Sequence, residues 1–163
     1  MKPLFGQVVL AAVLASSAGL ASADVNVNYV NPDKYADLPI NPWVRQVVLE
    51  DLAGYFNDLG KNLPEGQVLT VDITNIDMAG RPTSSNRGAK YRRTGGAAEW
   101  PRIELRYTLV ANGQALDSGT AQLKDMAYRD HIDLPSGVTD RLRYEKRMVK
   151  EWFEQTIIEK QAG

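Results

Sequence analysis

The chain contains no cysteine and a single histidine among its 163 residues. Without cysteine there are no disulfides, no thiolate metal sites and no cysteine nucleophile, so burial alone must hold the fold together. Neither sign of charge dominates, because 19 Lys and Arg residues stand against 20 Asp and Glu residues. Global charge therefore recruits neither nucleic acid nor an anionic membrane.

Long apolar runs are also missing, except at the N-terminus. Lys2 precedes an apolar run over residues 4–14, and small residues then lead to Ala21-Ser22-Ala23, which has the A-x-A pattern of a signal peptidase site. The run is shorter than the roughly 20 apolar residues that a spanning helix needs. No cysteine follows it, which excludes a lipid-anchored lipoprotein. We therefore predict that residues 1–23 are a cleavable signal peptide, cut between Ala23 and Asp24.

The predicted mature chain, residues 24–163, is expected to form a single globular domain in the periplasm without a transmembrane span. Removing Lys2 with the signal leaves 18 basic against 20 acidic residues, a formal charge of −2.

The first half of this domain reads as strand, helix, strand. Residues 25–29 alternate apolar and polar, which indicates a half-buried strand. Asn41-Pro42 is a helix-opening pair, and Gly60 is expected to end the helix because glycine accepts a positive φ. Residues 67–77 alternate again and predict a second strand. The apolar stripe of the helix consists of Val48, Leu52, Tyr55, Phe56 and Leu59.

The second half predicts a hairpin and a final helix. Residues 103–109 alternate cleanly, Asn112-Gly113 favours a tight turn, and residues 114–123 form the returning strand. Thr139-Asp140 is expected to start the last helix. The order β-α-β-β-β-α predicts an α+β two-layer sandwich, with a mixed, mostly antiparallel sheet and two helices on one face.

Five segments in order resemble a bacterial family called domain of unknown function 3016. They are Tyr29–Asp37, Ile76–Gly80, Pro101–Tyr107, Lys124–Tyr128 and Tyr144–Met148. The resemblance implies a small exported protein of Gram-negative type bacteria with one domain. It carries over no catalytic or binding residue.

The stretch from residue 79 to 98 is rich in glycine and cations and shows no apolar period. Arginine pairs bidentately with phosphate or carboxylate, and an aromatic ring stacks on a sugar, a base or a guanidinium. The stretch therefore suits an anionic ligand such as a lipid head group or an acidic glycan. The alternative is a solvated loop without a binding role, whose cations balance nearby carboxylates. The candidate ligand-binding residues are Arg87, Lys90, Arg92, Arg93 and Trp100.

A histidine lies among carboxylates at Asp130-His131-Ile132-Asp133, and Asp125 is close in sequence. Asp125, His131 and Asp133 are the candidate catalytic residues of an alternative function, a small hydrolase that acts with or without a metal ion. A surface loop explains the same residues, and no nucleophile elbow marks a serine.

The leading hypothesis is a non-catalytic envelope module that binds an anionic envelope component or a protein partner. Nucleic acid is disfavoured because the domain lacks a basic overall charge. No cofactor or metal motif occurs, and we expect neither group.

Overall fold

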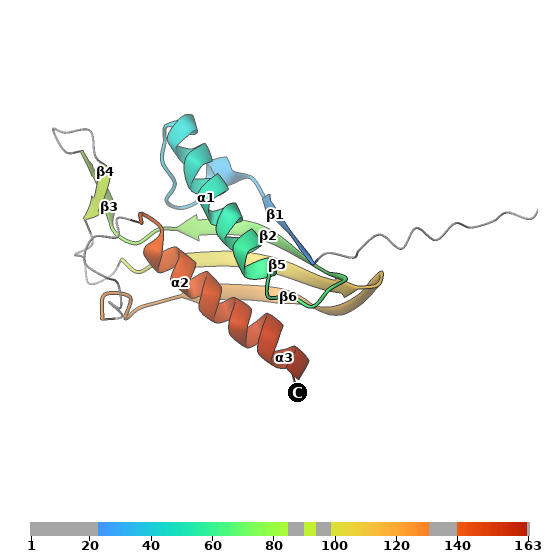
Figure 1. Ribbon diagram of the computed structural model, residues 1–163. Coiled ribbons are helices and arrows are strands. Elements are labelled where there is room, and N and C mark those ends of the chain that lie inside the picture. The colour runs from blue at the N-terminus through green and yellow to red at the C-terminus, as the bar shows by residue number, and fades with distance from the viewer. Residues whose placement is uncertain (1–22, 85–89, 94–98, 131–139, 163) are drawn as a thin grey trace, which may run out of the picture.

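A four-stranded sheet forms one layer of the protein and helices form the other (Figure 1). The computed structural model describes residues 23–84, 90–93, 99–130 and 140–162. In spatial order, the strands of the sheet are β1 (Asp24–Tyr29), β2 (Gln67–Asp77), β5 (Arg102–Ala111) and β6 (Gln114–Lys124). β1 pairs with β2 in parallel, and the other two pairings are antiparallel. The predicted α+β class and mixed, mostly antiparallel sheet are confirmed.

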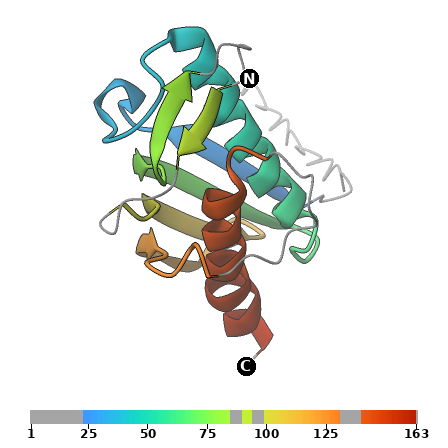
Figure 2. The ribbon, with the colours of Figure 1, turned by 90° about the vertical axis from the view of Figure 1, so that its left-hand side faces the viewer.

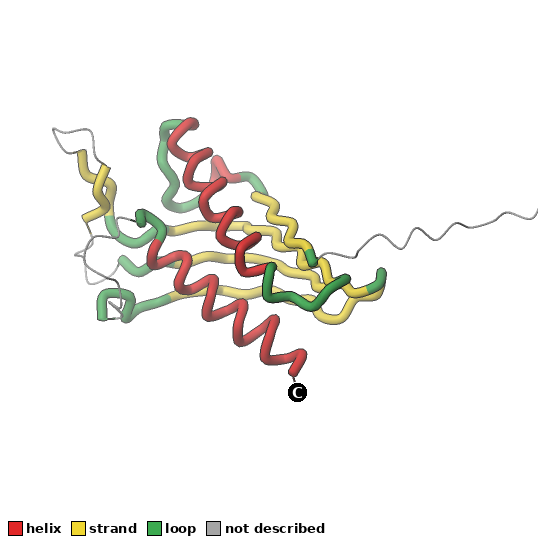
Figure 3. The backbone as a smooth tube through the Cα atoms, viewed as in Figure 1, coloured by secondary structure: helices red, strands yellow, loops and turns green. Residues whose placement is uncertain are grey.

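Both long helices lie on the same face of the sheet, as the helix and strand colours of Figure 3 make plain. α1 (Pro42–Gly60) crosses between β1 and β2. The last helix is continuous in Figure 1 and consists of α2 (Arg143–Trp152), a π-helical segment η2 (Phe153–Ile158) and α3 (Glu159–Ala162). A short 3₁₀ turn, η1 (Pro32–Lys34), follows β1.

The core lies between the two layers because alternate residues of the strands face the helices. On β5, every second residue from Ile103 to Leu109 is buried, and the residues between them face solvent. The opposite face of the sheet is polar, which an antiparallel sheet allows when only one side is covered. The predicted apolar stripe of α1 is also buried, apart from the half-buried Tyr55. The largest fully buried apolar side chains are Phe56, Phe153, Leu52, Leu69, Ile73, Ile76, Ile103, Leu105, Leu109, Leu142 and Ile157.

α1 begins and ends where predicted, but the reason given for its end was wrong. Asn41 caps the helix by accepting hydrogen bonds from the N–H groups of Trp43 (3.0 Å) and Val44 (3.3 Å). Gly60 is the last helical residue and has no positive φ. It is needed because α1 approaches β1 closely there. A Cβ atom at residue 60 would collide with Cγ2 of Val25.

A β-bulge interrupts β2 near its end. The pairing with β5 shifts between Ile73 and Asn75, so Thr74 is an extra residue. The bulge reverses the alternation that the sequence predicted for this strand: Ile73 and Ile76 are both buried. The carbonyl oxygen of Ile73 accepts hydrogen bonds from the Tyr35 hydroxyl (2.6 Å) and the Val30 N–H (2.9 Å).

The segment predicted to be irregular contains a two-stranded antiparallel ribbon, β3 (Arg81–Ser84) and β4 (Lys90–Arg93). The observed order is therefore the predicted one with this ribbon inserted between β2 and β5. Pro82 and the nearby glycines hide it from periodicity, because such residues are typical of turns. The ribbon projects from one end of the sheet (Figure 2).

α2 starts at Arg143, three residues after the predicted start at Asp140. Asp140 instead forms a turn before the helix, accepting a hydrogen bond from the N–H of Leu142 (2.8 Å). Its other oxygen binds Nζ of Lys146 (2.8 Å), which also binds Asp51 of α1 (2.8 Å). Burial opposes the charge on Lys146, but these two hydrogen bonds outweigh it and raise the Lys146 pKa. This half-buried triad ties the two helices together.

No helix within the described ranges has the length and apolar character needed to cross a membrane. The predicted signal peptide lies outside the described residues except for Ala23.

We predict that Gly60→Ala lowers the free energy of unfolding by about 1–3 kcal/mol, because the added methyl group overpacks the contact with Val25. Gly54→Ala is the matched control, since Gly54 is an exposed residue of the same helix and its Cβ would meet nothing within 4 Å. That control should be more stable by up to about 1 kcal/mol. Urea denaturation of both variants measures the difference. Equal stabilities would contradict the close approach of α1 to β1.

Candidate functional site at the ribbon end of the sheet

The ribbon end of the sheet is the end at which β2 finishes, β5 begins and β6 finishes. Asp77, Arg102 and Lys124 lie side by side there in the strand register. Figure 1 places the start of α2 and the β3–β4 ribbon at this same end. Segments far apart in the sequence thus meet within one small region, which makes it the natural place to look for a site.

The ribbon carries most of the predicted ligand-binding residues. Lys90, Arg92 and Arg93 lie on β4, while Arg87 lies outside the described residues. The register sets Arg81 opposite Arg93. Like charges directly opposite each other on paired strands are unfavourable. The register thus brings two basic residues of the ribbon to directly opposed backbone positions.

Trp100 lies at the ribbon end of the sheet, just before β5. The guanidinium of Arg102 lies over its ring, with Cζ 5.7 Å from the ring centroid. The indole Nε1 is buried and has no hydrogen-bond partner among the described residues. An unpaired buried N–H is costly. It is a donor that a water molecule or a ligand oxygen would satisfy.

Tyr128 supplies a second donor of this kind, which sequence reasoning did not single out. Its side chain is only 3 % exposed, and its ring meets that of Tyr144 edge to face, with centroids 4.8 Å apart. The hydroxyl is buried without a hydrogen-bond partner in the described part of the chain. Burial raises the pKa of Tyr128, so the hydroxyl keeps its proton at neutral pH. The segments of Tyr128 and Trp100 adjoin, since the N–H of Asp125 donates to the Pro101 carbonyl (3.3 Å).

The carboxylates of this end serve mainly to hold the structure. Asp77 accepts two hydrogen bonds from the Arg102 guanidinium, one of them from Nε at 3.1 Å. Glu145 of α2 is 1 % exposed, and its Oε1 accepts the N–H of Ala79 (3.1 Å) just before the ribbon. The last helix thus fixes the root of the ribbon. The burial of Glu145 has no sequence signal, because a charged residue in a helix is usually solvated.

The alternative catalytic residues are only partly visible. Asp125 is nearly buried, and its Oδ1 accepts the N–H of Ala127 (3.0 Å), the turn-setting role that such a residue has at the end of a strand. His131 and Asp133 lie outside the described residues. Within the described ranges, no group of three His, Asp or Glu side chains is placed to hold a metal ion.

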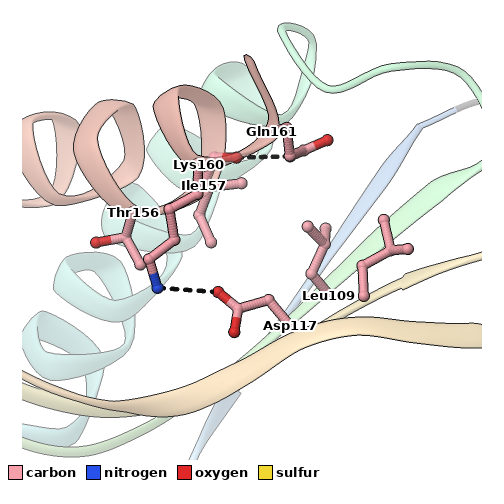
Figure 4. Close-up of a pocket in the computed structure, with 7 residues that line it drawn as sticks. Leu109, Asp117, Thr156, Ile157, Lys160 and Gln161 are labelled. Atoms are coloured by element: carbon pink, nitrogen blue, oxygen red, sulfur yellow. Dashed lines mark hydrogen bonds and ion pairs between the residues drawn. The ribbon is translucent and has the colours of Figure 1, made fainter. Parts of the chain in front are cut away.

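A small hollow of about 210 Å³ lies elsewhere, between β6 and the end of the last helix (Figure 4). Asp117 in its wall binds Nζ of Lys160 (3.2 Å) and the hydroxyl of Tyr107 (3.0 Å). Burial opposes ionisation of Asp117, but these hydrogen bonds outweigh it and hold its pKa below the usual value. The polar groups are already paired with one another, so the hollow is best explained as a helix-to-strand contact.

One family model matches the chain. The family model described as "Protein of unknown function (DUF3016)" matches residues 23–155. The match covers most of the chain, from just before β1 into η2. The protein is thus an α+β two-layer protein, and it belongs to this family. A search of the curated proteins gave no match.

We predict that Glu145→Ala lowers the free energy of unfolding by about 1–3 kcal/mol, because the buried N–H of Ala79 loses its acceptor. Glu145→Gln should cost less, since the amide oxygen can still accept. Glu154→Ala, on the exposed side of the same helix, is the control and should change stability by less than about 0.5 kcal/mol. Chemical denaturation compares the three variants. A loss for Glu145→Ala no larger than that for Glu154→Ala would show that Glu145 does not fix the ribbon.

Proposed function

We propose that the protein is an exported, non-catalytic envelope protein that binds an anionic ligand at the ribbon end of its sheet. The observation that carries this proposal is the charge of the segment from Met78 to Ala98. Its 21 residues include five Arg and Lys residues and no Asp or Glu. The strand register supports the proposal, because it sets cations opposite each other.

An anion would relieve the unfavourable arrangement on the ribbon. An oxyanion placed between opposed cations converts a repulsive pair into two attractive contacts, and a guanidinium offers a fork of N–H donors to it. Phosphate, sulfate and carboxylate groups share this chemistry.

The charge of the rest of the molecule localises the attraction for anions. The predicted mature chain has a formal charge of −2, so attraction is confined to the ribbon rather than spread over the surface. Such a domain suits a defined acidic partner in the envelope better than nucleic acid.

The proposed export leads to a separate prediction about the mass of the mature protein. Protein purified from the periplasm should have an intact mass that corresponds to a chain beginning at Asp24, because signal peptidase accepts the small residues at Ala21 and Ala23. Mass spectrometry of the denatured protein measures this. A full-length mass, or absence of the protein from the periplasmic fraction, would refute cleavage and export. Additional mass under native conditions that is lost on denaturation would reveal a retained ligand.

We predict that Arg87→Ala/Arg92→Ala/Arg93→Ala weakens binding to dextran sulfate, a soluble polyanion, at least tenfold at low salt. The reason is the loss of three charges from the ribbon segment, and wild-type binding should fall steeply as salt increases. Isothermal titration calorimetry provides the affinities.

The matched control is Lys61→Ala/Lys150→Ala/Lys160→Ala, which removes the same charge from exposed positions away from the ribbon. It should bind nearly as well as the wild type. Equal weakening in both triple variants would show that the ribbon has no special role.

A further inference from the structure

An exposed apolar stripe begins α1 and has no partner within the described structure. Ile40 is 94 % exposed, Trp43 is 83 % exposed and Val47 is 49 % exposed. Trp43 and Val47 are four residues apart on α1 and so lie on one side of the helix start, and Ile40 immediately precedes the capping residue Asn41. Single exposed apolar residues are common on proteins, but a contiguous set that includes a tryptophan marks an interaction surface.

The stripe is built on a firmly held turn. Asn41 caps the helix, Pro42 occupies the first helical position, and the neighbouring Arg45 is paired with Asp33 (2.7 Å). The side chains of the stripe are therefore presented on a preorganised backbone, which lowers the entropy cost of binding.

The first turn of α1 and the basic ribbon lie on the same side of the molecule. Figures 1 and 2 are views at right angles, and both place the start of α1 and the β3–β4 ribbon together at the top, away from β6 and α3. The two elements are far apart in the sequence, so only the fold brings the start of α1 and the β3–β4 ribbon to one side.

We infer that this side of the protein docks on an anionic lipid bilayer. This inference rests on the proposed function and names its ligand as the phosphate-bearing head groups of a membrane surface. Tryptophan and apolar side chains partition into the interfacial region, while Lys and Arg residues near the surface are attracted to anionic lipids. A soluble acidic glycan would use the ribbon but would leave the stripe in water. The stripe therefore favours the bilayer.

The test measures how much of the processed protein, purified from the periplasm, sediments with lipid vesicles. Binding is expected to vesicles that contain phosphatidylglycerol and not to vesicles of phosphatidylcholine alone. Trp43→Ala should weaken vesicle binding at least tenfold and leave the affinity for dextran sulfate unchanged. Leu116→Ala is the matched control, because Leu116 is a similarly exposed apolar residue of β6. It should bind vesicles like the wild type.

The outcomes separate the two proposals. Binding to dextran sulfate without binding to anionic vesicles would overturn the membrane inference and leave the anion-binding function standing. If the wild type bound neither dextran sulfate nor anionic vesicles, both proposals would be overturned. Vesicle binding that resists Trp43→Ala would overturn the role of the stripe. A complex with another protein that buries Trp43 while vesicles remain unbound would likewise assign the stripe to a protein partner.

Discussion

The β-bulge at Thr74 is the constraint on which the rest of the structure depends. In a regular strand, residues 73, 75 and 77 would all face the helices, and Asp77 would be driven into the apolar layer. The extra residue resets the alternation, so Ile76 is buried and Asp77 pairs with Arg102 instead. On the β1 side of the same strand, the Tyr35 hydroxyl and the Val30 N–H donate to the Ile73 carbonyl, and Asn75 accepts the N–H of Ala36 through its side chain.

That arrangement explains why the segment around η1 is packed against the end of β2. The Tyr35 hydroxyl is buried, and burial raises its pKa to about 12, so it remains a hydrogen-bond donor through the physiological range. The N–H of Asp37 also donates to the Ile76 carbonyl (3.1 Å). The chain between β1 and α1 is thereby fixed, and with it the position at which α1 begins. The same hydrogen bonds therefore help to set the position of the exposed residues from Ile40 to Val47.

The ribbon end of the sheet also depends on the bulge, through the residues that follow Asp77. Beyond Asp77 the chain turns past Ala79, whose N–H is held by the buried Glu145, and then enters β3. A rigid sheet and the last helix thus support a strongly cationic ribbon at one point. The proposed binding role rests on this fixed root and on the charge of the segment beyond it.

Much of the fold was predictable from the sequence because its periodicities are local. The β5 alternation, the Asn112-Gly113 turn with positive φ at both residues, and the cap of α1 at Asn41 are set by neighbouring residues. The same reasoning failed where a distant contact decides the outcome. Gly60 is required by Val25, and the last helix starts at Arg143 because Asp140 forms a turn and binds Lys146.

The candidate site divides in the same way. The sequence alone determined that cysteine chemistry is excluded and that residues 78–98 carry five cations and no carboxylate. Only the tertiary structure decided that four of these cations lie on a paired ribbon, that Glu145 is buried and accepts the N–H of Ala79 just before it, and that the first turn of α1 lies on the same side. The physical reason is that charge and period belong to neighbouring residues, whereas burial and juxtaposition arise when strands and helices distant in the chain share one core.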